Sequence, residues 1–113
     1  MTQRPLAELE TQLGYKFADQ SLLQQALTHA SFSGPTASYE RLEFLGDRVL
    51  GLLLAHYFYD HCPDDNEGAL SLRLHSEART ETLAKVARKL NIADFLQTQP
   101  GMRFDDNDSV LAD

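Results

Sequence analysis

Apolar residues recur at helical spacing along most of the chain, whereas no segment alternates apolar and polar residues convincingly enough to suggest a β-strand. Turn-forming residues interrupt this pattern: Gly14 ends a first leucine-lined segment, and Pro63 ends the longest one. Asp19 and Ser38 stand where helix N-caps are expected. The sequence therefore predicts one all-α domain, a helical bundle around a long central helix. The predicted helices cover about residues 5–13, 20–28, 39–61, 67–75 and 77–91, and a short helical turn follows at 92–96.

The long predicted helix has an apolar side. At ~100° per residue, its apolar residues share an arc of roughly 100°, which is the pattern of a helix that faces a core. We therefore expect these side chains to be buried. Gly46 lies beside the arc, and we expect a close neighbour to require its small size, because glycine inside a helix costs up to about 1 kcal/mol relative to alanine. The arc consists of Leu42, Leu45, Val49, Leu52 and Leu53.

The opposite side of the same helix is acidic. Glu40, Glu43 and Asp47 fall within an arc of about 60°. Neighbouring like charges on a helix repel by a few tenths of a kcal/mol, and Arg41 and Arg48 point away from this arc. Two interpretations follow: a solvated acidic face, or a site for a divalent cation. Mg²⁺ in particular binds carboxylates together with water and substrate phosphate.

Composition restricts the class of protein. The chain has 113 residues, 42% of them hydrophobic, which is enough for one domain with a modest core. Its single cysteine, Cys62, excludes an intrachain disulfide. No signal peptide or membrane span is evident, so we expect a soluble cytoplasmic protein. The net charge of −7 argues against nucleic-acid binding, unless bound cations or a separate basic domain attract the phosphates.

Several segments together identify a family. The segment "ERLEFLGD" at 40–47 closely resembles the signature of the ribonuclease III family, endonucleases that cut double-stranded RNA. Further segments resemble the family in the same order, so that the likeness covers nearly the whole chain, 1–113, as the nuclease domain of a bacterial member. They are "LGYKF" at 13–17, "LLQQALTHAS" at 22–31, "EGALS" at 67–71, "ETLA" at 81–84 and "SVLAD" at 109–113.

The resemblance implies a metal site. It assigns Glu43, Asp47 and Asp113 as ligands of Mg²⁺, for which Mn²⁺ can substitute, and it gives Glu43 and Asp47 catalytic roles. A fourth ligand, a glutamate three residues beyond Asp113, would fall outside the 113 residues. We therefore expect these residues to be an incomplete nuclease domain, inactive alone, without the double-stranded-RNA-binding domain that normally follows in the family.

The resemblance also implies the reaction and the partners. Each strand of a duplex RNA would be cut by a homodimer to leave 5′-phosphate and 3′-hydroxyl ends with two-nucleotide 3′ overhangs, in the processing of rRNA and mRNA. Phe44 would insert into the partner subunit, whereas Glu40 and Glu67 would lie at the substrate-binding or dimer cleft. We expect no small-molecule cofactor and no membrane association.

Three residues depart from the family pattern and put local RNA contacts in doubt. Tyr39 replaces an asparagine, Arg48 replaces a small residue, and Ala30 replaces a basic residue. None of them removes a proposed metal ligand. Two other classes stay open: a non-catalytic RNA- or ribosome-associated module that retains the fold, and an acidic helical protein-interaction domain.

Overall fold

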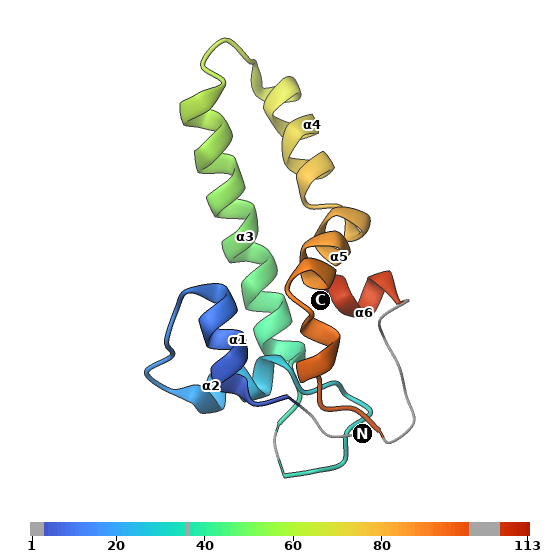
Figure 1. Cartoon of the computed structure of the whole chain (residues 1–113). Helices are drawn as coiled ribbons and strands as arrows, with labels where there is room; N and C mark the ends of the chain where they lie inside the picture. The colour runs from blue at the N-terminus through green and yellow to red at the C-terminus, as the bar shows by residue number, and fades with distance from the viewer. Residues whose placement is uncertain (1–3, 36, 100–106) are drawn as a thin grey trace.

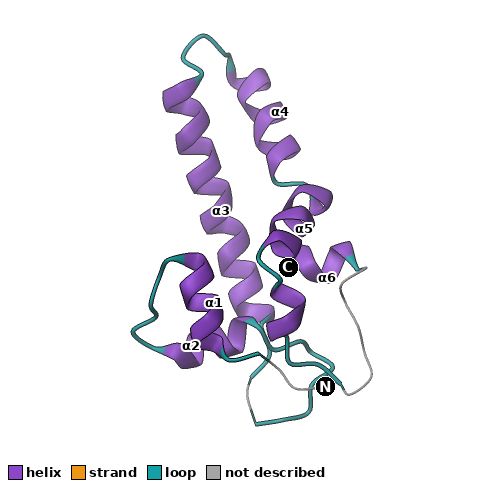
Figure 2. Cartoon of the chain, viewed as in Figure 1, coloured by secondary structure: helices purple, strands orange, loops and turns teal. Residues whose placement is uncertain are grey.

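The computed structural model of the chain describes residues 4–35, 37–99 and 107–113. The described part contains helices and no β-strand, apart from an isolated backbone bridge between Thr28 and Gln97 (Figure 2). The predicted all-α fold is therefore confirmed. In chain order the helices are α1 (Leu6–Leu13), α2 (Gln20–Ala26), α3 (Glu40–His61), α4 (Glu67–Glu77), α5 (Thr80–Lys89), the 3₁₀ helix η1 (Ile92–Phe95) and α6 (Asp108–Ala112).

The helices form an elongated molecule (Figure 1). α3 and α4 run antiparallel as a long hairpin that projects from the rest of the fold. α1, α2 and η1 lie around the base of this hairpin, and α6 packs on α5. The projecting hairpin accounts for the unequal extents of the molecule, 50 × 29 × 24 Å.

The main hydrophobic core lies at the base of the hairpin, where α1 and α2 meet η1. Its buried side chains are Leu9, Leu23, Leu27 and Phe95. Burial of one such side chain contributes about 1.5–3 kcal/mol relative to full exposure. This cluster therefore fixes the three short helices against one another, and partly buried residues surround it: Leu6, Phe17, Ile92 and Leu96.

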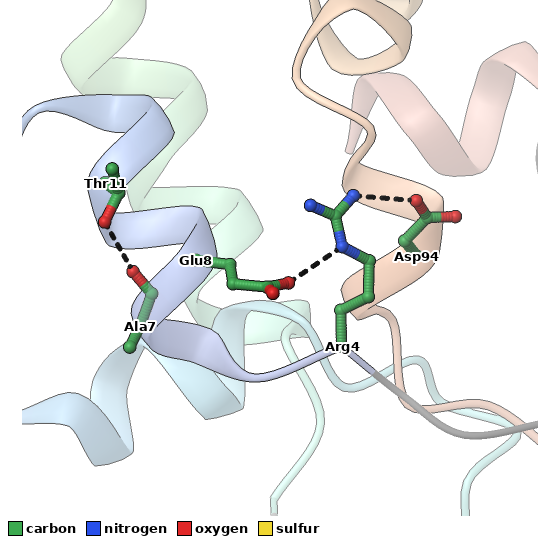
Figure 3. A network of polar contacts seen from close by, with 5 residues as sticks. All are labelled: Arg4, Ala7, Glu8, Thr11 and Asp94. Carbon is green, nitrogen blue, oxygen red and sulfur yellow. Dashed lines mark hydrogen bonds and ion pairs between the residues drawn. The ribbon is translucent and has the colours of Figure 1, made fainter.

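Polar contacts of Arg4 reinforce the same junction from its surface (Figure 3). The guanidinium group lies 2.9 Å from the Glu8 carboxylate in α1 and 3.0 Å from the Asp94 carboxylate in η1. Its central carbon also lies 4.8 Å from the centroid of the Phe95 ring. Exposed ion pairs contribute only about 0–1 kcal/mol each, so these contacts orient α1 and η1 more than they stabilise the fold.

A second junction connects the end of α2 to the segment after η1. The backbone N–H of His29 donates to the carbonyl oxygen of Gln97 at 2.8 Å, and the N–H of Gln97 donates to that of Leu27 at 2.8 Å. Thr28 between them is fully buried, and its hydroxyl group donates to the Gln24 carbonyl oxygen at 2.6 Å. The segment that leads into α3 therefore starts from a rigid point.

The predicted end of α1 and the predicted start of α2 agree with the structure. Gly14 ends α1 with a φ of 68°, a left-handed conformation that glycine adopts without steric cost. Asp19 caps α2, because its carboxylate accepts a hydrogen bond from the backbone N–H of Ser21 at 3.0 Å. α2 ends at Ala26, two residues before the predicted end at Thr28, because Thr28 belongs to the backbone bridge.

Two later boundaries are wrong. Tyr39, and not Ser38, occupies the N-cap position of α3. The helix predicted from residue 77 begins instead at Thr80, because α4 continues to Glu77. No glycine or proline lies between the last turn of α4 and the first turn of α5, so the sequence contains no strong signal at this junction.

The predicted burial of the apolar side of α3 is also wrong for most of its residues. Leu45, Val49, Leu52 and Leu53 are 57%, 47%, 70% and 61% exposed. Phe58 is the only buried residue of α3. An amphipathic pattern indicates that a face suits an apolar neighbour, but it does not identify that neighbour, and the described residues place no helix over this face.

The expectation for Gly46 is wrong for the same reason. A Cβ atom at this position would meet no heavy atom within 4 Å in the described structure. The small size of the residue is therefore not required by any neighbour seen here.

Although α3 is 22 residues long, neither it nor another helix among the described residues combines the length and apolarity needed to cross a membrane.

Candidate functional site

The first turns of α3 carry the three predicted acids. Glu40 and Glu43 lie in the first turn, where unpaired backbone N–H groups favour negative charge, and Asp47 follows one turn later. The helix dipole therefore offsets part of the repulsion among these carboxylates. The start of α3, which carries these acids, lies at the base of the hairpin, next to the α2–α3 loop (Figure 1).

The short helix α6 brings a fourth acid to the same place. Asn107 caps α6 with its side-chain oxygen, which accepts a hydrogen bond from the N–H of Val110 at 3.2 Å. Leu111 then packs into a buried cluster with Ala84 and Ala87 of α5. These contacts fix the direction in which α6 ends, so that Asp113 reaches the start of α3.

Tyr39 joins the two parts of the site. Its hydroxyl oxygen lies 3.3 Å from Oδ2 of Asp113, to which it donates a hydrogen bond. The side chain is only 7% exposed. Burial, and then the negative charges of Asp113 and Glu43, raise the pKa of Tyr39 to about 12, so the hydroxyl group keeps its proton at neutral pH.

The surroundings of Glu43 affect its protonation. Its pKa is raised, first because the group is partly desolvated and next because of the negative charge of Asp113 and a side-chain hydrogen bond with that residue. Glu40 and Asp47 add smaller effects in the same direction. The structure therefore brings Glu43 and Asp113 into direct interaction, although they lie far apart in the sequence.

A cavity lies between these acids. It has a volume of about 370 Å³, and Tyr39, Glu43, Asp47 and Asp113 all line it. Small and apolar side chains of α2, α3, α5 and α6 form the rest of its wall. A second hollow of about 290 Å³ lies along the α3–α4 hairpin and contains Glu77 beside Arg73, without a cluster of carboxylates.

The acids of the first cavity are suited to a hard divalent cation. Crowded carboxylates favour a bound positive charge, and Mg²⁺ commonly uses one or two protein carboxylates together with water. Glu43, Asp47 and Asp113 would supply these oxygens. Within the described ranges, however, no group of three or more His, Cys, Asp or Glu side chains is close enough to hold a metal ion without rearrangement.

Other predicted site residues lie outside this cavity. Phe44 is 67% exposed on α3, and the guanidinium carbon of Arg48 lies 5.6 Å from the centroid of its ring. Glu40 is exposed at the start of α3 and does not line the cavity. Glu67 begins α4, beyond the far end of α3, so the described structure does not bring it to Glu43.

Comparisons with known proteins identify the family. A family model described as Ribonuclease-III-like matches residues 19–113. Ribonuclease 3 from Rhizobium meliloti is 48% identical over 93 residues, which are 81% of this chain and 39% of that protein. Ribonuclease 3 from Brucella canis is 45% identical over 91 residues, 80% of this chain and 37% of that protein. The chain thus spans less than half the length of these relatives.

Solved structures resemble the chain over nearly its full length. A nuclease domain of ribonuclease III from Campylobacter jejuni, described for flexibility in a region involved in dimer formation, has a TM-score of 0.86 and 36% identity, covering 96% of this chain and 77% of that one. A second structure of the Campylobacter domain has a TM-score of 0.84 and the same identity of 36%. Because the family model, the sequence identities and the fold all agree, the chain belongs to the ribonuclease III family.

Proposed function

We propose that these residues form the nuclease module of an Mg²⁺-dependent endonuclease that cleaves double-stranded RNA. The observation that carries the proposal is the meeting of Glu43 and Asp113 at one cavity that Asp47 also lines. Repelling carboxylates from α3 and α6 have no evident structural benefit at this place, whereas a cation between them would offset the repulsion. Family membership supports the same reaction.

The acids of the cavity would serve as metal ligands in this reaction. Glu43, Asp47 and Asp113 would hold Mg²⁺, or Mn²⁺ in its place, through hard oxygen donors. The bound ion supplies positive charge that acidifies water and stabilises the negative charge developing at the phosphate during hydrolysis. No covalent nucleophile is needed from the protein. The products would carry 5′-phosphate and 3′-hydroxyl ends.

A homodimer would place two such sites across one RNA duplex and leave two-nucleotide 3′ overhangs. The exposed ring of Phe44 and the uncovered leucines of α3 support an interface on this side of the molecule, because large exposed apolar surfaces commonly mark binding sites. Glu40, at the start of α3, and Glu67, at the start of α4, would face the cleft between the subunits.

The proposed setting is the processing of rRNA and mRNA in the cytoplasm. A net charge of −7 does not by itself favour RNA binding, so cations in the acidic cavity and a basic partner domain would have to supply the attraction. Recognition would depend mainly on the phosphates and 2′-hydroxyl groups of the A-form duplex, and therefore little on base sequence.

The test uses the full-length protein that carries this sequence. With millimolar Mg²⁺ it should cut long duplex RNA and leave single-stranded RNA and duplex DNA largely intact. Asp47→Asn should slow cleavage by more than about 100-fold, with little loss of duplex binding, because the substitution removes a metal ligand and leaves phosphate contacts elsewhere. Asp60→Asn is the matched control, since Asp60 is an exposed aspartate on the same helix that pairs with His56.

A non-catalytic RNA-associated module is the second candidate. The observation in its favour is that no group of three potential ligands is assembled among the described residues. Such a module would bind duplex RNA equally well in the wild type and in Asp47→Asn, with no cleavage by either protein. Cleavage by the wild type that is lost in Asp47→Asn and kept in Asp60→Asn excludes it.

A further inference from the structure

We propose that Tyr39 is a positioning residue of the acidic site, and that its hydroxyl group holds the Asp113 carboxylate beside Glu43 so that both can face one cation. This inference rests on the proposed function. It also gives a role to a residue that departs from the family pattern, in which an asparagine usually stands at this position.

The first argument is the rigidity of Tyr39. Its backbone N–H donates to the carbonyl oxygen of Thr28 at 3.0 Å, and its own carbonyl oxygen accepts from the N–H of Glu43 at 2.7 Å. The ring meets that of His29 edge to face, with centroids 5.8 Å apart. Because Thr28 is fully buried and belongs to the bridge with Gln97, the phenol projects from a fixed base.

The second argument is that Asp113 needs such a guide. It stands at the end of α6, where the Asn107 cap and the packing of Leu111 act on the helix and not on the Asp113 carboxylate itself. It also lies next to Glu43, and like charges favour separation of the two carboxylates. In the described structure, Asp113 is the hydrogen-bond partner of the Tyr39 hydroxyl group, which offers a positive hydrogen to one of the two repelling groups.

The third argument comes from the length of the contact. At 3.3 Å the oxygen–oxygen distance is longer than the common value of about 2.7–2.8 Å. Such a long bond biases the direction of the Asp113 carboxylate without fixing it. An orienting contact of this kind should affect metal affinity more than the maximal rate at saturating metal.

The experiment compares the wild-type full-length protein with Tyr39→Phe, which keeps the ring and removes only the hydroxyl group. Binding of Mn²⁺ is measured by electron paramagnetic resonance, and duplex cleavage is measured as a function of Mg²⁺ concentration. We expect the dissociation constant for Mn²⁺ to rise about tenfold, as for other residues that orient a metal ligand. Cleavage by the variant should approach the wild-type rate at high Mg²⁺.

Tyr57→Phe is the matched control, because Tyr57 lies on the same helix, is exposed, and stacks on His61 away from the acids. It should leave Mn²⁺ affinity unchanged. An unchanged Mn²⁺ affinity in Tyr39→Phe overturns the positioning role, even if the variant melts at a lower temperature. The proposed function would still stand if the wild type cleaves duplex RNA and Asp47→Asn does not. A wild-type protein that binds no Mn²⁺ and cuts no duplex overturns both.

Discussion

The cap of α6 offers a direct test of how the site is assembled. Asn107→Ala removes the oxygen that accepts a hydrogen bond from Val110 at 3.2 Å. Loss of an N-cap costs about 1 kcal/mol, which corresponds to roughly a fivefold change in a local equilibrium. Because the cap acts on the first turn of α6, local opening of that turn should become about fivefold more frequent.

Amide hydrogen exchange measures this opening residue by residue. The N–H groups of Leu111 and Asp113 donate to Asn107 and Ser109 at 3.1 and 3.2 Å, so each should exchange about fivefold faster in the variant. The temperature of global unfolding should change little, since the main core lies elsewhere. Weaker Mn²⁺ binding should accompany the faster exchange, because Asp113 leaves the cavity whenever α6 opens.

A matched substitution shows whether the effect is local. Asn66 caps α4 in the same way, accepting a hydrogen bond from the N–H of Ala69 at 2.9 Å. Asn66→Ala should therefore speed exchange at the start of α4 and leave Leu111 and Asp113 as in the wild type. If Asn107→Ala leaves exchange at those two amides unchanged, the cap does not hold α6, and the account of how Asp113 is positioned is refuted.

Three further substitutions test the core, the uncovered face and the acidic site. Phe95→Ala should lower the free energy of unfolding by about 3–5 kcal/mol in denaturant titrations, because the side chain is fully buried; a loss below about 1 kcal/mol would contradict this. Leu52→Gln, at a position 70% exposed, should change the free energy of unfolding of the monomer by no more than about 0.5 kcal/mol. It should weaken homodimerisation in analytical ultracentrifugation, and dimerisation as strong as in the wild type would contradict the proposed interface. Glu43 binds its proton more tightly in the folded protein, so the stability that this proton confers is present below the ordinary pKa of 4.5 and is lost as pH rises through the raised pKa. Glu43→Gln should remove this loss. The measurement is the melting temperature of both proteins as a function of pH in the acid range, and the same pH dependence in the two proteins would disprove the prediction.

Local features of the fold could be predicted from the sequence. The caps at Gly14 and Asp19 depend on one residue and its neighbours, and both were predictable. The long helix was predictable because its apolar and acidic residues repeat over many turns. The junction between α4 and α5 was not predictable, because the residues on both sides favour a helix and the break between the two helices depends on tertiary packing.

The candidate site divides in the same way. Glu40, Glu43 and Asp47 share one side of a helix, so their proximity follows from helical geometry. The approach of Asp113 to Glu43 depends on how α6 packs against α5, and no periodic pattern specifies that contact; only the family resemblance suggested it. The contact of Tyr39 with Asp113 was not predicted. A buried hydroxyl group needs a hydrogen-bond partner, but the sequence alone does not show which residue provides it.

The distance along the chain between the two halves of the site has a consequence during protein synthesis. Asp47 and Asp113 are 66 residues apart, and ribosomes add roughly 5–20 residues each second. The acids of α3 are therefore made roughly 3–13 s before Asp113. Throughout that interval the nascent chain would carry only part of the proposed cation site. The proposed site would therefore be able to bind its cation fully only after translation has passed Asp113.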